Sequence, residues 1–105
     1  MSTDILSRPE LLALGREAAE SVAGREAVGD VDVSVFLDST DEPAYMFCIL
    51  IDKVHTRAPS DRLYVALSRR LRDALLSRQD SHLPLLRILD QKDWSQRSGE
   101  QSVRA

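Results

Sequence analysis

The chain is poor in residues that would tie it to a special class of protein. It has one cysteine among its 105 residues, so an internal disulfide is excluded and a reducing compartment is favoured. No apolar run approaches the roughly 20 residues that span a bilayer. The N-terminus also lacks the basic and then apolar form of a secretory signal. We therefore expect a cytoplasmic protein that does not associate with membranes.

Specific motifs for catalysis, metal binding or nucleotide binding are absent as well. Hydrophobic residues make up 43% of the chain and charged residues 30%, which is ordinary for a globular protein. A chain of this length forms one domain with a real core but has little room for a second layer of helices. Composition therefore indicates a single small domain and leaves its function open.

Charge is distributed unevenly along the chain. Residues 1–56 hold four Lys or Arg against eleven Asp or Glu, a net charge of −7. Residues 57–105 hold ten against six, a net charge of +4, and the two sum to the overall −3. Such a dipolar chain favours self-association or an oppositely charged partner over broad affinity for nucleic acid.

The stretch 31–52 is the centre of the predicted fold. Valine or leucine occupies every second position of 31–37, which is the period of a strand with one face in a core. The polar segment 39–43 predicts a turn. The apolar run 45–51 then predicts a strand that is apolar on both faces, as expected at the centre of a sheet.

Two helices are predicted, one before and one after these strands. Ser7 and Glu10 have the spacing of a capping box, and small and apolar residues then recur at helical spacing over 9–23. A second apolar stripe with the same period, which includes Tyr64, predicts a helix over 60–78.

A short apolar run predicts a third strand over 85–89, and the polar composition of 95–105 predicts a disordered tail. The expected order is α-β-β-α-β in one α+β domain, residues 1–94. A right-handed crossover would place the third strand parallel to the second. Both helices would then cover one face of a three-stranded mixed sheet.

The other face of this sheet is expected to lack a cover. In the expected register it carries the apolar residues Phe36, Met46, Cys48 and Leu50, with Leu86 or Ile88 added from the third strand. A monomer seldom leaves so contiguous an apolar patch in water. We therefore expect a homodimer through this face. The alternatives are that Trp94 and the tail fold back over it, or that the register differs.

Three aspartates are the first candidate for chemistry. Asp30 and Asp32 alternate on the first strand, and Asp52 ends the second. Three such carboxylates can hold a divalent cation that aligns phosphates, so metal-dependent phosphoryl or nucleotidyl transfer is an alternative function. The glycine-serine turn that nucleotidyltransferases place upstream of such a pair is absent, which favours solvated residues at strand ends.

The outer face of the second helix is the next candidate. Arg62, Val65, Arg69, Arg72 and Leu76 follow one another at spacings of three and four. This row predicts either a solvated helix face or a surface that binds an acidic protein partner through its arginines. A nucleic-acid accessory protein is the weaker alternative, because the chain is acidic overall.

The remaining residues offer little chemistry. His55 and His82 fall in predicted loops, where no Cys or His stands at metal-ligand spacing, so both are expected to be surface residues. Cys48 is expected to be a packed, inert thiol. No cofactor is expected. The sequence therefore predicts a small non-enzymatic protein that dimerises or binds a protein partner.

Overall fold

The computed structural model describes residues 6–56 and 60–96, and it confirms the α-β-β-α-β order. Its elements are helix α1 (Arg8–Ala23), the single-turn 3-10 helix η1 (Arg25–Ala27), strands β1 (Val28–Leu37) and β2 (Pro43–Ile51), helix α2 (Ser60–Leu76) and strand β3 (Leu83–Leu89). Residues 91–96 form a further short helix after β3.

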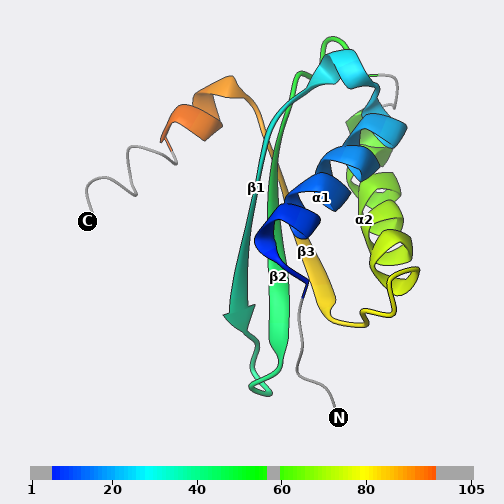
Figure 1. Cartoon of the computed structure of the whole chain (residues 1–105). Coiled ribbons are helices and arrows are strands. Elements are labelled where there is room, and N and C mark those ends of the chain that lie inside the picture. The colour runs from blue at the N-terminus through cyan, green and yellow to red at the C-terminus, as the bar shows by residue number, and fades with distance from the viewer. Residues whose placement is uncertain (1–5, 57–59, 97–105) are drawn as a thin grey trace.

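The three strands form one mixed sheet with β2 in the middle. β2 runs antiparallel to β1 and parallel to β3. Helices α1 and α2 lie side by side on one face of the sheet (Figure 1). The predicted two-layer α+β architecture is therefore confirmed. We call the face that is turned away from α1 and α2 the outer face.

The register of the strands is also the expected one. Val33 of β1 pairs with Phe47 of β2. Phe47 in turn pairs with Leu86 of β3. All three are buried and belong to the core beneath the helices. Because side chains alternate between the two faces of a strand, Asp32 and Cys48, which pair one position away, point to the outer face.

Helix α1 begins and ends as its sequence indicates. The Ser7 and Glu10 side chains form the predicted capping box at its N-terminus. At its C-terminus Gly24 adopts a positive φ of 96°, which residues with a side chain rarely accept. Both ends of α1 are thus set by local chemistry.

Gly15 is the point at which α1 comes closest to the sheet. A Cβ atom added to Gly15 would lie 3.0 Å from Cδ1 of Phe47 and 3.2 Å from Cγ1 of Val31. Both contacts are tighter than ordinary packing. The absence of a side chain at Gly15 therefore allows α1 to lie directly on β1 and β2.

Several details differ from the sequence-based expectation. Leu86 is buried and Ile88 packs against the same core, so neither contributes to the outer face. Tyr64 was expected in the core stripe of α2, but it is 52% exposed. Trp94 lies half-buried in the helix over 91–96, which takes in the first two residues of the expected tail. Residues 97–105 lie outside the described residues.

Replacing Gly15 by valine tests the close contact between α1 and the sheet. Valine has a higher helix propensity than glycine, so any loss of stability must come from overpacking against Phe47 and Val31. We expect Gly15→Val to reduce the free energy of unfolding, measured in urea, by about 1 to 3 kcal/mol. Ala13→Val, at an exposed position of α1, is the control and should cost less than about 0.7 kcal/mol. Equal stability of native protein and Gly15→Val would contradict the packing.

Candidate functional site

All four residues predicted for the self-interface lie on the outer face. Phe36 of β1 and Met46 and Leu50 of β2 are partly buried, while Cys48 at the centre of the sheet is 6% exposed. Neither α1 nor α2 covers this face, and the helix over 91–96 lies on its side of the sheet beyond the end of β3 (Figure 1). The structure therefore brings the four residues together on one surface.

Strand β3 extends this apolar surface with residues that the sequence did not single out. Leu83 pairs with Ala44, Leu85 pairs with Met46, and both point to the outer face. Leu83 is 42% exposed. Three rows of this face run across the whole sheet, each with one residue from β1, one from β2 and one from β3, while Leu50 pairs only with Leu89 of β3.

One of these rows carries opposite charges at its two ends. Cys48 stands in the middle, Asp32 stands beside it on β1, and Arg87 stands on its other side on β3. Asp32 is partly buried and accepts a hydrogen bond from the guanidinium of Arg8. Arg87 is exposed. The outer face is therefore apolar along β2 and is flanked by the Asp32 carboxylate, which is paired with Arg8, on one side and by the exposed Arg87 on the other.

The three aspartates proposed as metal ligands are engaged elsewhere or stand apart. Asp32 pairs with Arg8, and Asp52 Oδ2 lies 2.6 Å from Nδ1 of His55, a contact that lowers the Asp52 pKa. Asp30 lies in a bulge of β1, between Val28 and Val31. In residues 6–56 and 60–96, no three His, Cys, Asp or Glu side chains form a group that could hold a metal ion. The structure does not gather the aspartates into one site.

The arginine row of α2 is exposed, as the sequence pattern indicates. Arg62, Arg69 and Arg72 all face solvent. Val65 and Leu76, which stand between them, are 55% and 53% exposed. Within the part of the chain that the structure describes, none of these three arginines forms an ion pair. This face of α2 is therefore open to a partner.

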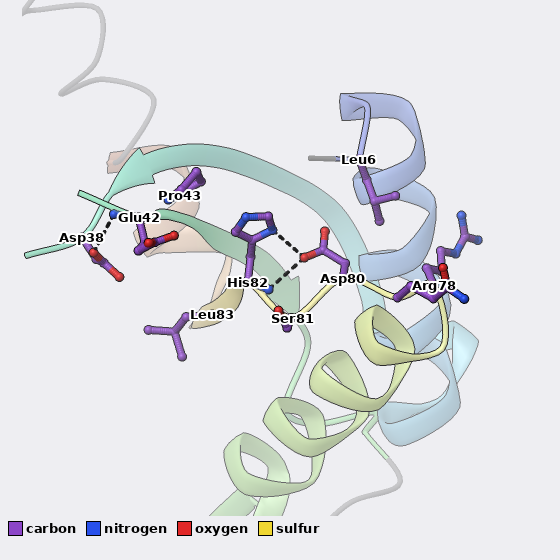
Figure 2. Close-up of a pocket in the computed structure, with 10 residues that line it drawn as sticks. Leu6, Asp38, Glu42, Pro43, Arg78, Asp80, Ser81, His82 and Leu83 are labelled. Atoms are coloured by element: carbon purple, nitrogen blue, oxygen red, sulfur yellow. Dashed lines mark hydrogen bonds and ion pairs between the residues drawn. The ribbon is translucent and has the colours of Figure 1, made fainter. Parts of the chain in front are cut away.

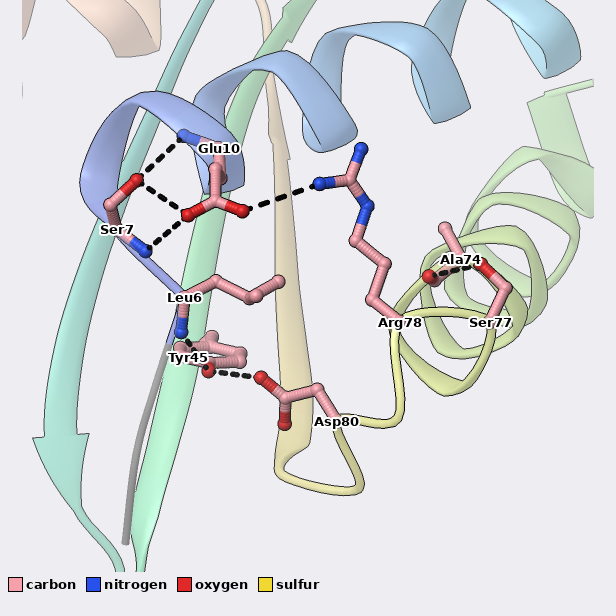
Figure 3. Close-up of polar contacts among 8 residues, drawn as sticks. All are labelled: Leu6, Ser7, Glu10, Tyr45, Ala74, Ser77, Arg78 and Asp80. Atoms are coloured by element: carbon pink, nitrogen blue, oxygen red, sulfur yellow. Dashed lines mark hydrogen bonds and ion pairs between the residues drawn. The ribbon is translucent and has the colours of Figure 1, made fainter.

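A buried polar network that the sequence did not reveal lies at the end of the sheet where β2 begins. The hydroxyl of Tyr45 donates a hydrogen bond to Oδ2 of Asp80, and the backbone N–H of Leu6 donates to that hydroxyl at 3.4 Å (Figure 3). An ion pair of 3.5 Å between Arg78 and Glu10 lies beside it. The network thus joins the start of α1, strand β2 and the turn after α2.

His82 completes this network on the side of β3. Its backbone N–H donates to Oδ1 of Asp80 at 2.8 Å, and its Nδ1 lies 2.6 Å from the same oxygen (Figure 2). Because an ionised carboxylate only accepts hydrogen bonds, the Nδ1 of His82 carries a proton that it donates to Asp80. The His82 side chain is 16% exposed, so the expectation of a surface histidine is wrong.

The network shifts the protonation equilibria of its members. Burial, together with the hydrogen bond to Asp80, raises the pKa of the Tyr45 phenol. Burial opposes the charge on Asp80, but the hydrogen bonds from Tyr45 and His82 outweigh it and hold the pKa of its carboxyl below the ordinary value. Asp80 therefore stays ionised although it is only 7% exposed.

A cavity of about 750 Å³ opens beside this network, between the turn that joins β1 to β2 and the turn before β3 (Figure 2). Asp38, Glu42, Arg78, Asp80 and His82 contribute its polar lining. An imidazole oriented by a carboxylate is the arrangement of a general base. In the described part of the chain, however, His82 has no hydrogen bond to a hydroxyl or thiol that it could activate. The hydrogen bonds of the network hold together the start of α1, strand β2 and the turn after α2.

Sequence reasoning missed Asp80 because its main partner is distant along the chain. Tyr45 and Asp80 are 35 positions apart, and nothing local marks them as a pair. One signal was present: a tyrosine on the core face of a strand needs a partner for its hydroxyl. Which residue becomes the partner of the Tyr45 hydroxyl depends on how the chain turns after α2. There the backbone N–H of Asp80 donates a hydrogen bond to the carbonyl of Leu75 at 2.9 Å.

Asp80→Asn tests the network through its pH dependence. Because the folded pKa of Asp80 lies below its ordinary value of 3.8, the ionised carboxylate stabilises the fold above that pH, and this contribution is lost as the pH falls through the folded pKa. We expect Asp80→Asn to reduce the free energy of unfolding at neutral pH by about 1 to 3 kcal/mol, with a smaller difference from the native protein in acid. Urea unfolding over a pH series measures this. Asp73→Asn, on the exposed side of α2, should leave the native pH profile unchanged, and a pH-independent effect of Asp80→Asn would contradict the assignment.

Three further findings bear on what the protein is. In the described residues no helix is long and apolar enough to cross a membrane. No protein-family model matches the chain, and no curated protein matches it in sequence. What the protein does has to be inferred from the outer face, the arginine row and the Asp80 network.

Proposed function

We propose that the protein is a small cytoplasmic, non-enzymatic binding module that forms a homodimer through the outer face of its sheet. The observation that carries the proposal is the apolar surface of β2 and β3 on the side without α1 and α2, with Phe36, Met46 and Leu50 only partly buried. Apolar area of this kind gains free energy when a second surface removes it from water.

The size of the face predicts a weak dimer. Seven residues of β3, at about 3.3 Å each, and three strands, at about 4.8 Å spacing, give a footprint of roughly 300 Å². Burying about 400 Å² of apolar surface over two copies contributes on the order of 10 kcal/mol. Association costs about 4 to 15 kcal/mol. The two terms are similar, so the molar mass should rise with concentration.

The arginine row of α2 supports a second role for the same module. Three exposed guanidinium groups without ion pairs in the described residues, alternating with Val65 and Leu76, suit an acidic and partly apolar protein segment. Helix α2, which carries the row, lies on the face of the sheet opposite the outer face (Figure 1), and Arg72 and Leu76 near its C-terminal end line a hollow together with Leu83 of β3. A dimer through the outer face would therefore present two such rows to solvent.

Met46→Lys tests the dimer. A lysine in the middle of the outer face would be desolvated at the interface without an opposite charge, while in a monomer it can reach water. We expect light scattering to give the monomer mass at concentrations where the native protein is dimeric, with an unchanged circular dichroism spectrum. Val65→Lys, which places the same residue on exposed α2, is the control and should dimerise like the native protein. A native protein that stays monomeric at every concentration would rule out the proposed self-association.

Arg69→Ala and Arg70→Ala test the arginine row with two neighbours in the sequence. Both residues are exposed, but only Arg69 belongs to the row. With poly-glutamate as the probe, we expect Arg69→Ala to weaken binding and Arg70→Ala to leave it close to native. The free energy of unfolding of both variants should lie within about 0.5 kcal/mol of that of the native protein. Equal effects of the two substitutions would show that general positive charge, and not this row, binds the probe.

A further inference from the structure

The order of residues across the outer face carries information about how a second copy would sit on it. In one row Asp32, Cys48 and Arg87 follow one another from β1 to β3. In a row nearer the other end, Phe36 and Leu83 flank Ala44. The face therefore has opposite charges at the two ends of one row and large apolar residues at the two ends of another.

Two identical sheets can meet face to face about a two-fold axis in two main ways, because homodimers are usually symmetric. An axis along β2 keeps each residue at its level along the strands and exchanges β1 with β3. An axis across the strands instead keeps β1 over β1 and reverses the levels. The two arrangements bring different residues together.

With the axis along β2, each of these two rows faces the same row of the other copy in reversed order, and the facing residues are complementary. Asp32 of one copy faces Arg87 of the other, and this happens twice. Phe36 of one copy likewise faces Leu83 of the other, which covers a side chain that is 42% exposed in the single chain. In this arrangement each charged residue of the first row therefore faces an opposite charge, and each large apolar residue of the second row faces another apolar residue.

With the axis across the strands through the same charged row, the contacts become unfavourable. Asp32 would face Asp32, each paired with its own Arg8, and the two exposed Arg87 side chains would face each other without a carboxylate between them. Like-charge contacts of this kind select against an arrangement. Phe36 would move away from Leu83 toward the other end of the partner's β1.

We propose that a second copy of this chain docks on the outer face about a two-fold axis along β2, with Arg87 of each copy against the Asp32 edge of the other. This inference rests on the proposed self-association and adds the arrangement of the two copies. Met46 and Cys48 of β2 then lie against their own counterparts on the axis. Arg87 joins an acidic edge at which Arg8 already binds Asp32.

Cysteine cross-linking distinguishes the two axes. In a Cys48→Ser background, which removes the only cysteine of the chain, one protein carries Asp32→Cys and another carries Arg87→Cys. Each is treated with a short bismaleimide, alone and after mixing. With the axis along β2, covalent dimers form only in the mixture, because position 32 faces position 87. Arg69→Cys in the same background is the control for random collision and should give no covalent dimer alone or mixed.

The other results of this experiment overturn the proposal. Covalent dimers from either protein alone indicate an axis across the strands. A mixture that does not cross-link, while light scattering shows that the Cys48→Ser protein is dimeric, means that the copies meet through another surface. A native monomer removes the proposed function itself.

A charge exchange gives an independent reading of the same arrangement. We expect Arg87→Asp and Asp32→Arg each to raise the dimer dissociation constant about tenfold or more, because each creates two like-charge contacts. The double variant, with both changes in one chain, should restore dimerisation. Arg8→Ala is the control, since it removes the ion pair of Asp32 without changing the charge at position 32. A double variant no better than the single ones would overturn the proposed axis.

Discussion

The structure depends on the need to bury both faces of β2. This strand is apolar at almost every position, and Tyr45, Phe47, Ile49 and Ile51 are fully buried beneath the helices. Its alternate residues point the other way, where neither α1 nor α2 reaches. The two long helices of residues 6–56 and 60–96 cover one side of the sheet, so the second side is left to another surface. The proposed dimer would bury this second face of β2.

The covered side shows how closely the layers must fit. Helix α1 lies on the sheet at a glycine, and the leucines of α2 fill the rest of the core. Where the apolar core ends, the hydroxyl of Tyr45 is satisfied by the ionised Asp80. A buried carboxylate is tolerated only when it is well hydrogen-bonded, and here Tyr45 and His82 provide those bonds. The network therefore ties the start of α1 and the turn after α2 to the central strand.

The two candidate binding surfaces lie on opposite sides of this frame. The outer face is built from alternate strand residues, and the arginine row from the exposed side of α2. At the β3 edge, however, the two surfaces approach each other, because Arg72 and Leu76 line a hollow together with Leu83. The uneven charge of the chain follows the same division, since its acidic strand β1 and its basic helix α2 come from the two halves of the sequence.

The sequence alone determined the two long helices, the three strands, their order, the register of β1 on β2 and the face on which Phe36, Met46, Cys48 and Leu50 lie. These features follow from periodicity, because a strand alternates every two residues and a helix repeats every 3.6. It misplaced Leu86 and Tyr64, since a short apolar run does not reveal its register and an apolar stripe does not reveal where its partner layer ends.

Only the tertiary structure decided the contacts between residues far apart in the chain. It paired Tyr45 with Asp80 and set Asp32, Cys48 and Arg87 in one row. It also kept Asp30, Asp32 and Asp52 from forming a metal-binding group in the described residues. The physical reason is that local patterns set which way a side chain points. Which distant residue it meets depends on how the whole chain packs.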